Sequence, residues 1–345
     1  MKRKLRLGLV GSGFVGQLAH IRNYNINPKV TITALAELRP KLGQSVCDRY
    51  GIKNYYKNHL DLLKNKDIEA VVAIVNRKHT AYIARDILKK GFNLFTEKPM
   101  AATFNEAQEL VNLSKKKKCK YVIGNMRRHD EGVQNAYSLF QKLIKENKLG
   151  KIIYFRSYCY AGGDYCNIDG EITTSEPRPN KRYSPAGPEW LPTKKHSEFE
   201  RFLNYFIHDI NLIRFFFKDN FSIASFKKNK NMSNIIFDYG NFYGSFEGAY
   251  LDQNMWDEGL EIFFEKGHMK ISLPPAFLRN QPAKIEIYED QNNSKQISYK
   301  SDWTWSFKKQ TDDFVDVILK NKSSICSAED SLKDIKVIED IWKLD

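Results

Sequence analysis

The chain has 345 residues, more than one hydrophobic core usually serves, so two domains are expected. Its 42% apolar and 13% aromatic residues exclude a disordered chain. The formal net charge is +14, but the excess lysines are spread among acids. The one dense basic run, Ser114 to Lys120, is interpreted as a solvated helix end and not as a nucleic-acid patch.

The cysteine and hydropathy patterns exclude further classes of protein. Five widely spaced cysteines without a CxxC pair argue against a disulfide scaffold and structural zinc, so reduced thiols and no metal site are expected. No apolar run is long enough to span a membrane, and the one near the N-terminus is too short for a secretion signal. These patterns predict a soluble, cytoplasmic protein with no membrane or nucleic-acid partner.

A glycine-rich turn follows the first predicted strand, Leu5 to Val10, and leads into a helical pattern that begins at Phe14. The spacing is GxGxxG, in the strand-to-helix context that dinucleotide binding requires. Gly11 would make the tight turn, Gly13 would let the backbone approach a pyrophosphate, and Gly16 would let the helix pack closely. The predicted cofactor-binding loop is Gly11, Ser12, Gly13, Phe14, Val15 and Gly16.

The next predicted strand, Val30 to Glu37, ends on an acid about 20 residues after the glycine loop. A carboxylate at that place can bind the adenosine ribose hydroxyls, and its charge would repel the extra phosphate of NADP. Glu37 therefore favours NAD. Arg39 and Lys41 could offset that repulsion, so NADP stays open.

Strands and helices continue to alternate through the first third of the chain. Apolar runs without polar alternation are typical of a parallel sheet buried on both faces. The further predicted elements are a strand at 68–75, a helix at 80–90, a strand at 92–99, a helix at 104–117 and a strand at 120–125. The alternation predicts a doubly wound parallel sheet.

Lys98 comes at the carboxyl end of one of these strands, the edge at which such sheets bind ligands. Pro99 behind it would fix the backbone, which suits a lysine that presents its ammonium to a cofactor and substrate. A turn with a helix-initiating proline is the alternative interpretation of the same residues.

In the second half, Glu200 to Lys218 is apolar nearly all round, which indicates a buried helix. Its polar exceptions Asn204, His208 and Asn211 are spaced i, i+4 and i+7, within one narrow stripe. A single histidine of this kind is often a satisfied core residue. Three polar residues in one stripe are also consistent with the wall of a site.

Together, GSGFVG at 11–16, Asn76-x-x-His79, Glu97-Lys98-Pro99 and GNMRRHD at 124–130 resemble the Gfo/Idh/MocA oxidoreductases. These NAD(P)-dependent enzymes act on sugars, inositols and related polyols. The resemblance implies a Rossmann domain at 1–125 and, at 126–345, an α+β substrate and oligomerisation domain with an open, mostly antiparallel sheet. It places Lys98 beside the reacting hydroxyl, with a cis bond to Pro99, and Glu97 near the nicotinamide ribose. It also places Val75, Asn76 and His79 at the cofactor.

The same resemblance assigns roles in the second half. The family motif D-x-x-x-H-x-x-D supplies substrate contacts and a catalytic histidine, and here it reads Asn204, His208 and Asn211. His208 is the expected base, and the missing first acid puts the usual Asp-His-Lys arrangement in doubt. Arg127 and Arg128 match the family's paired arginines, one for the site and one for a structural ion pair.

A stretch rich in Tyr, Gly and Pro, residues 158–192, is predicted to be a long loop that covers the substrate, or else a solvated or subunit-packing excursion. Predicted substrate-binding residues are Asn204, Asn211, Arg127, Tyr165, Arg182 and Trp190. Later segments of the chain are interpreted as antiparallel strands whose open face makes a homodimer or homotetramer.

The sequence predicts an NAD-dependent dehydrogenase that moves a hydride between the nicotinamide and a hydroxyl carbon of a sugar, nucleotide sugar or cyclitol. Lys98 would polarise the oxygen and His208 would handle the proton. Two alternatives remain: an NAD-dependent glycosidase of the same fold, and a catalytically silent sensor that binds dinucleotide.

The acid at position 37 makes a quantitative prediction. NAD should bind at least about tenfold more tightly than NADP, roughly 1.4 kcal/mol, because the Glu37 carboxylate repels the 2′-phosphate. Titration of the purified protein with NADH and NADPH, followed by nucleotide fluorescence, measures both affinities. Equal affinities, or tighter binding of NADPH, would show that Arg39 or Lys41 outweighs Glu37.

Overall fold

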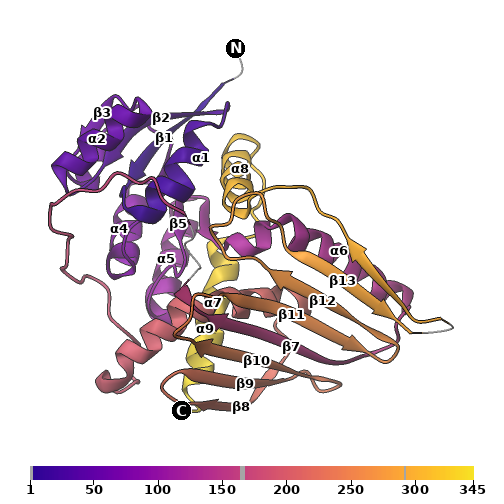
Figure 1. Ribbon diagram of the computed structural model, residues 1–345. Helices are drawn as coiled ribbons and strands as arrows, with labels where there is room; N and C mark the ends of the chain where they lie inside the picture. Colours follow the sequence, from indigo (N-terminus) through magenta and orange to yellow (C-terminus); the bar gives the residue numbers. More distant parts are fainter. Residues whose placement is uncertain (1–2, 164–167, 291–292) are drawn as a thin grey trace. The chain divides into compact units, whose positions relative to one another are not determined.

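The computed structural model describes residues 3–163, 168–290 and 293–345 (Figure 1). Its contacts divide the chain into two units. Unit 1 holds the residues up to Asn125 together with Asp169–Asn204 and Phe307–Lys336, and unit 2 holds the remainder. These units are defined by contacts between residues and are not domains of continuous sequence. The domain division at 1–125 and 126–345 therefore stays a prediction.

A six-stranded sheet of parallel pairs forms the centre of unit 1, in the order β3-β2-β1-β4-β5-β6. Its strands are β1 (Leu5–Val10), β2 (Val30–Ala36), β3 (Asn54–Tyr56), β4 (Ala70–Ala73), β5 (Asn93–Glu97) and β6 (Tyr121–Gly124). The order reverses direction between β1 and β4, where doubly wound sheets bind ligands. The predicted Rossmann sheet is confirmed.

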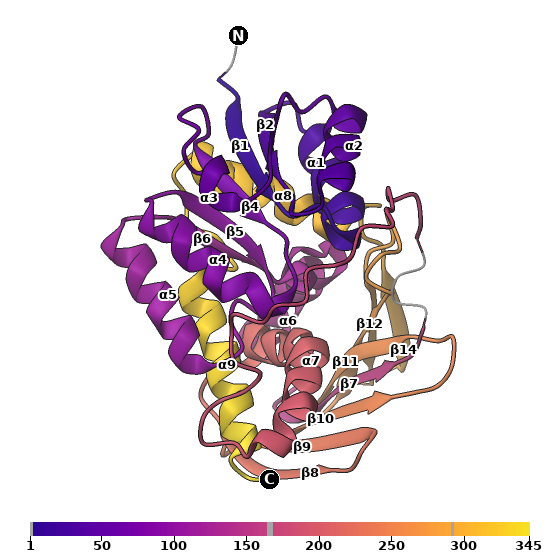
Figure 2. The ribbon, with the colours of Figure 1, turned by 90° about the vertical axis from the view of Figure 1, so that its left-hand side faces the viewer.

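Helices cover both faces of this sheet (Figure 2). They are the π-helix η1 (Gly16–Ile21), α1 (Arg22–Asn25), α2 (Pro40–Tyr50), α3 (His59–Leu62), α4 (Arg77–Lys89), α5 (Phe104–Lys116) and α8 (Ser306–Leu319). Figure 2 shows α1, α2 and α8 on one face and α3, α4 and α5 on the other. The helix predicted from Phe14 opens with the wider π-helical turn of η1 before α1 continues it.

The core of unit 1 includes residues from distant parts of the chain. Phe314 of α8 is fully buried and packs against Tyr24, at a ring-centroid distance of 6.5 Å, and against Phe95, at 5.6 Å. Leu7 and Val72 of the sheet belong to the same cluster. Because β1 and β4 are buried on both faces, their sequences are nearly continuous apolar runs.

Unit 2 is built on an eight-stranded sheet in the order β14-β13-β12-β11-β7-β10-β9-β8. The pair β7 and β10 is parallel and the others are antiparallel, so the predicted mostly antiparallel sheet is confirmed. Its strands are β7 (Ile152–Ala161), β8 (Ser222–Lys228), β9 (Met232–Asp238), β10 (Tyr243–Tyr250), β11 (Asp257–Phe264), β12 (Gly267–Leu273), β13 (Lys284–Glu289) and β14 (Lys295–Tyr299).

Strand β7 corrects one prediction. Residues 158–161 were expected in the long loop, but they complete this strand. The reason is an alternating pattern that the aromatic and glycine content obscured: Phe155, Ser157, Cys159 and Ala161 are all buried. The irregular segment begins only after Ala161.

Aromatic side chains join this sheet to its helices. The helical elements not yet named are η2 (Met126–His129), α6 (Glu131–Glu146), η4 (Thr193–Lys195), α7 (His196–Phe217) and α9 (Ala328–Trp342). Of these, η4, α7 up to Asn204 and α9 up to Lys336 belong to unit 1. Phe217 of α7 stacks on Phe155 of β7, at 4.3 Å between ring centroids, and Phe140 of α6 meets Phe264 of β11 at 6.5 Å. Since α7 buries nearly its whole circumference, the prediction of a buried helix holds.

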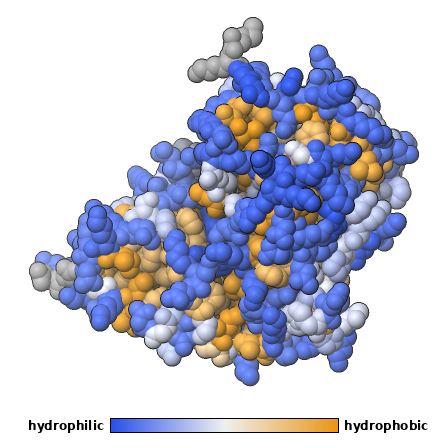
Figure 3. Space-filling model, turned by 180° about the vertical axis from the view of Figure 1, so that it is seen from behind, coloured by the Kyte–Doolittle hydropathy of each residue, from blue (hydrophilic) through white to orange (hydrophobic). Residues whose placement is uncertain are grey.

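Hydrophilic residues predominate on the face drawn in Figure 3, with apolar residues in small groups between them. Among the described residues, Trp303 is the most exposed of the large hydrophobic side chains, at 86%. No helix within the described ranges is long and apolar enough to cross a bilayer.

Close packing at Gly244 makes a testable site. A Cβ atom there would lie 1.9 Å from the Phe155 ring, which is fully buried and stacked on Phe217. Gly244→Ala should lower the free energy of unfolding by about 1–3 kcal/mol, because the ring has no space to move into. Urea unfolding measures the change, and Ser245→Ala on the same strand, which adds no volume, is the control. Equal midpoints for the two variants would contradict this packing.

Candidate active site

The glycine loop connects β1 to η1 in a geometry that depends on two of its glycines. Gly11 has φ +88°, and a Cβ there would lie 2.3 Å from the carbonyl oxygen of Ile74. At Gly16 a Cβ would lie 3.1 Å from the Gly11 carbonyl oxygen. At Gly13 the space that a Cβ would enter is open to 4 Å. The loop therefore packs tightly on the protein side and leaves room for a ligand at Gly13.

A cavity of about 360 Å³ lies beside this loop. It is large enough for a small-molecule ligand. The predicted cofactor residues that line it are Gly11, Gly13, Phe14, Val15, Gly16, Glu37, Arg39, Val75, Asn76 and His79. Ser12, Glu97 and Lys98 are not among its lining residues. The open space at Gly13 and this cavity fit a dinucleotide, whose phosphates would lie against the loop.

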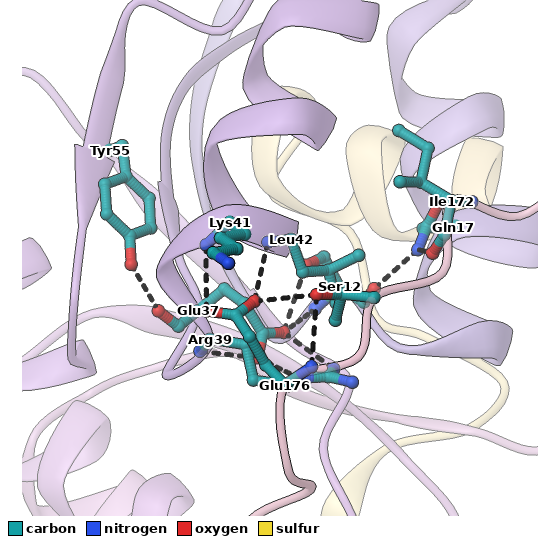
Figure 4. Close-up of polar contacts among 10 residues, drawn as sticks. Ser12, Gln17, Glu37, Arg39, Lys41, Leu42, Tyr55, Ile172 and Glu176 are labelled. Carbon is teal, nitrogen blue, oxygen red and sulfur yellow. Dashed lines mark hydrogen bonds and ion pairs between the residues drawn. The ribbon is translucent and has the colours of Figure 1, made fainter.

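Glu37 lines the cavity and forms hydrogen bonds with residues of the loop and of the segment before α2 (Figure 4). Its carboxylate accepts hydrogen bonds from the backbone N and Oγ of Ser12, both at 3.0 Å, and from Nε of Arg39 at 2.8 Å. Burial raises the pKa of Glu37, but the hydrogen bonds from Arg39 and Ser12 outweigh burial, and the net pKa lies below the ordinary value. Glu37 is therefore a carboxylate at neutral pH, with Arg39 as its counter-charge.

Asn76 and His79 mark the start of α4, and each has a defined partner. Asn76 is the N-cap of the helix, where its side chain accepts a hydrogen bond of 3.0 Å from the backbone N of Lys78. His79 is buried, and its Nε2 lies 2.5 Å from the carbonyl oxygen of Lys181. The cap bond fixes Asn76 in the cavity wall, and the contact with Lys181 fixes His79 there.

Glu97 ends β5 within a second polar cluster. His20 Nε2 lies 2.9 Å from Glu97 Oε1, and Gln310 Nε2 donates to the same oxygen at 3.4 Å. A Cβ at position 124 would lie 2.7 Å from Glu97 Oε1, so Gly124 leaves the space that this carboxylate occupies. His20 has no signal in the sequence, because it lies in an apolar helical pattern next to the glycine loop.

Lys98 follows Glu97 directly, and the structure defines both its backbone and its ammonium group. The peptide bond to Pro99 is cis, as predicted. The ammonium Nζ donates a hydrogen bond of 2.8 Å to the carbonyl oxygen of Asn204 on α7, within unit 1. His208 lies one helical turn after Asn204 on α7 and is half-buried. The ammonium of Lys98 therefore lies at the carboxyl end of β5.

In unit 2, both predicted arginines have structural partners. Arg127 is buried, forms a two-pronged ion pair with Glu258, and donates to the Pro274 carbonyl oxygen at 2.8 Å. Arg128 donates to the Asn211 carbonyl oxygen at 3.1 Å, and Asn211 is itself buried. A role of Arg127 or Asn211 in substrate binding stays a prediction.

The predicted residues of the long loop are placed differently. Arg182 pairs with Glu200 through its Nη2, at 2.9 and 3.1 Å. Trp190 is 42% exposed. Tyr165 lies outside the described residues. Within the described ranges, no three His, Cys, Asp or Glu side chains gather in a group that could hold a metal ion.

Comparison with known proteins adds a family assignment. Residues 5–125 match the model of the oxidoreductase family with an NAD-binding Rossmann fold, GFO_IDH_MocA. Residues 5–125 of the chain therefore belong to the Gfo/Idh/MocA family. An inositol 2-dehydrogenase of Salmonella typhimurium is 29% identical over 159 residues, 45% of this chain and 46% of the relative. A levoglucosan dehydrogenase of Pseudarthrobacter phenanthrenivorans is 30% identical over 164 residues, 45% of this chain and 40% of the relative. The chain therefore matches under half the length of these curated relatives.

Solved structures show the same fold over nearly the whole chain. A putative NADPH-dependent oxidoreductase from Desulfitobacterium hafniense has a TM-score of 0.79 at 12% identity, covering 99% of this chain and 96% of the other. The 3-ketoreductase KijD10 from Actinomadura kijaniata, in complex with NADP and TDP-benzene, has a TM-score of 0.76 at 14% identity. That comparison covers 99% of this chain and 98% of the other. At these identities the comparison establishes the fold alone.

The cavity also has lining residues that were not among the predicted cofactor-binding residues. Lys57, Asn58 and His59 line the cavity from the segment after β3, and Arg178 and Pro179 line it from the irregular segment after β7. None has a spacing signal relative to the glycine loop. Only the parallel sheet order, which places β3 beside β2, could have indicated the first three.

The ionised state of Glu37 makes a pH prediction. Because its folded pKa lies below the ordinary value of 4.5, Glu37 stabilises the fold above that pH and loses its effect as the pH falls through the folded pKa. Glu37→Gln should cost about 2 kcal/mol at pH 7, and the difference from the parent should shrink below pH 4.5.

Urea unfolding of both proteins between pH 3 and 7 tests this expectation. Asp67→Asn, which removes an exposed carboxylate from the same unit, is the matched control and should show little difference at any pH. A constant gap between Glu37→Gln and the parent across the whole range would mean that the carboxylate charge does not stabilise the fold.

Proposed function

We propose that this Gfo/Idh/MocA chain is an NAD-dependent dehydrogenase that acts on a CH–OH group of a sugar, nucleotide sugar or cyclitol. The observation that carries the proposal is the placement of Lys98, whose ammonium is fixed at the carboxyl end of β5 by the Asn204 carbonyl oxygen. The glycine loop opens from the carboxyl end of β1 in the same sheet. A fixed ammonium and a dinucleotide cavity at one sheet edge suit hydride transfer.

Each residue has a distinct task in this proposal. When NAD is bound, its nicotinamide accepts the hydride. Lys98 donates a hydrogen bond to the reacting oxygen and stabilises the negative charge that develops there. His208 removes the hydroxyl proton. Glu37 binds the adenosine ribose hydroxyls, and its carboxylate favours NAD over NADP.

The substrate class rests on the relatives and on the polar side chains of α7. Inositol 2-dehydrogenase and levoglucosan dehydrogenase are names of proteins that act on polyhydroxylated rings. Asn204 and Asn211 offer amides that can orient such hydroxyls without adding charge. Arg127, Arg182 and Trp190 remain candidates for the same role.

The open face of the unit 2 sheet supports a homodimer or homotetramer. Arg156 of β7 pairs with Glu247 of β10 at 3.0 Å and stacks over Tyr158, at 4.8 Å to the ring centroid. Tyr243 of β10, in register with Tyr154 of β7, is 51% exposed. A face with paired charges and an exposed aromatic side chain is suited to contact a second copy of itself.

Substitution of Lys98 tests the proposal once a panel of sugars, nucleotide sugars and inositols has given a substrate by NADH absorbance. Lys98→Met should lower kcat by about a hundredfold or more and leave the Kd for NAD nearly unchanged, since the ammonium acts on the reacting oxygen. Unchanged turnover would make the lysine structural and refute the mechanism.

The reciprocal control is Lys57→Met, because Lys57 lines the dinucleotide cavity. It should weaken dinucleotide binding and leave kcat at saturating cofactor close to the parent value. Release of an aglycone without net NADH would indicate the glycosidase alternative instead. Dinucleotide binding without turnover on any substrate would indicate the sensor.

A further inference from the structure

Residues 169–184 form an extended segment without helix or strand, which we call the strap. The strap follows β7 in the chain, yet its contacts group it with unit 1. Figure 1 shows it as a long coil that passes α2 and α4. Its path over unit 1 is held by a hydrogen bond of 2.7 Å from Arg49 Nη1 of α2 to the Gly170 carbonyl oxygen, and by three further anchors.

The first anchor is the side-chain amide of Gln17, on η1 (Figure 4). Gln17 Oε1 accepts a hydrogen bond of 2.8 Å from the backbone N of Ile172, and Nε2 donates to the Ile172 carbonyl oxygen at 3.0 Å. Gln17 is buried, and Ile172 packs against the core cluster of unit 1. The side chain of Gln17, in the first turn of the helix after the glycine loop, thus pairs with both backbone polar groups of Ile172.

The second anchor lies at the N-terminus of α2. Its own N-cap residue, Arg39, makes no side-chain capping bond. Glu176 of the strap accepts hydrogen bonds from the backbone N atoms of Lys41 and Leu42, both at 3.0 Å. A carboxylate at this place satisfies free N–H groups and complements the helix dipole. The strap therefore supplies the cap that the local sequence of α2 lacks.

The third anchor is the first turn of α4. The backbone N atoms of Tyr183 and Ser184 donate to the Lys78 carbonyl oxygen at 3.1 and 3.0 Å. The Tyr183 ring stacks on Tyr82, with centroids 4.5 Å apart and planes at 17°. The helices α2 and α4 follow β2 and β4, the strands on either side of β1. Arg39, directly before α2, and His79 of α4 both line the dinucleotide cavity.

Arg178 and Pro179 lie between the second and third anchors, and both line that cavity. We propose that the strap crosses the mouth of the dinucleotide cavity and retains the cofactor, so that its release requires the strap to detach from α2. Arg178 adds a cation facing a ligand that carries phosphates. The proposal rests on the proposed function, because it assumes that a dinucleotide occupies the cavity.

A retaining strap makes a kinetic prediction. When a segment must open for a ligand to enter and to leave, opening limits both rates. Glu176→Ala removes two hydrogen bonds that hold the strap to α2 and none to the cavity. The dissociation rate constant of the dinucleotide should rise about tenfold, and the association rate constant should rise with it, so Kd changes much less than either.

Stopped-flow fluorescence on the full chain measures both rate constants, with NADH and separately with NADPH. Glu171→Ala is the matched control: it removes the same charge from the strap, at a residue with no hydrogen bond or ion pair to other described residues. If Glu176→Ala, but not Glu171→Ala, releases and binds the dinucleotide faster, the result supports the proposal that the strap retains the cofactor.

Three other outcomes would overturn it. Rate constants within twofold of the parent would show that α2 capping does not limit release. The same acceleration in Glu171→Ala would assign the effect to charge. A raised Kd with slower association would mean that Glu176→Ala damages the cavity instead of opening it.

The same measurements separate the two proposals. If neither dinucleotide binds the parent protein, the proposed function fails together with the role of the strap. If one binds and Glu176→Ala leaves its rate constants unaltered, only the role of the strap fails.

Discussion

Glu37 connects three elements of unit 1 through its carboxylate and its backbone carbonyl oxygen. It holds Ser12 in the loop after β1 and Arg39 at the start of α2, while its backbone carbonyl oxygen accepts a 2.8 Å hydrogen bond from Tyr55 of β3. The loop after β1, the end of β2, strand β3 and the start of α2 thus meet at one residue. A buried charge is costly unless it is fully paired, so this network is stable only as a complete set.

The same requirement shapes the second polar cluster, at the end of β5. Glu97 accepts from His20 and Gln310, which come from opposite ends of the chain, and Gly124 on the neighbouring strand leaves it room. Lys98 then extends from a backbone whose preceding side chain is already fixed. Preorganised neighbours of this kind are what a reactive ammonium needs, because little rearrangement is then required when charge develops on the substrate.

The parts of this structure that sequence could predict are those with a local signal. The β1 strand matched its predicted bounds because a short apolar run ends at a glycine, and Lys98 was placed because strand ends in a parallel sheet share an edge. The wall residues Lys57 and Arg178 had no such signal. The contact between Glu176 and α2 joins residues 135 apart, and no periodic pattern reports a partner at that distance.

Local signals also misled at β7, where glycines and tyrosines after Arg156 were interpreted as loop. The alternation of buried residues along Phe155, Ser157 and Cys159 was the stronger constraint, because the strand pairs on both sides, with β10 and β11. Position in the middle of a sheet overrides composition here, as it commonly does for strands.

Phe314 has a consequence for how the protein is made. It is fully buried between Tyr24 and Phe95, and Ile123 of β6 donates its backbone N–H to the Cys326 carbonyl oxygen. A ribosome synthesises the residues up to 125 long before these partners exist. The part of the Rossmann sheet that packs against Phe314 and Cys326 therefore stays uncovered until these residues have emerged. A chaperone that shields this part of the sheet during synthesis would bind the first third of the protein. It would dissociate when Phe314 and Cys326 pack against the sheet.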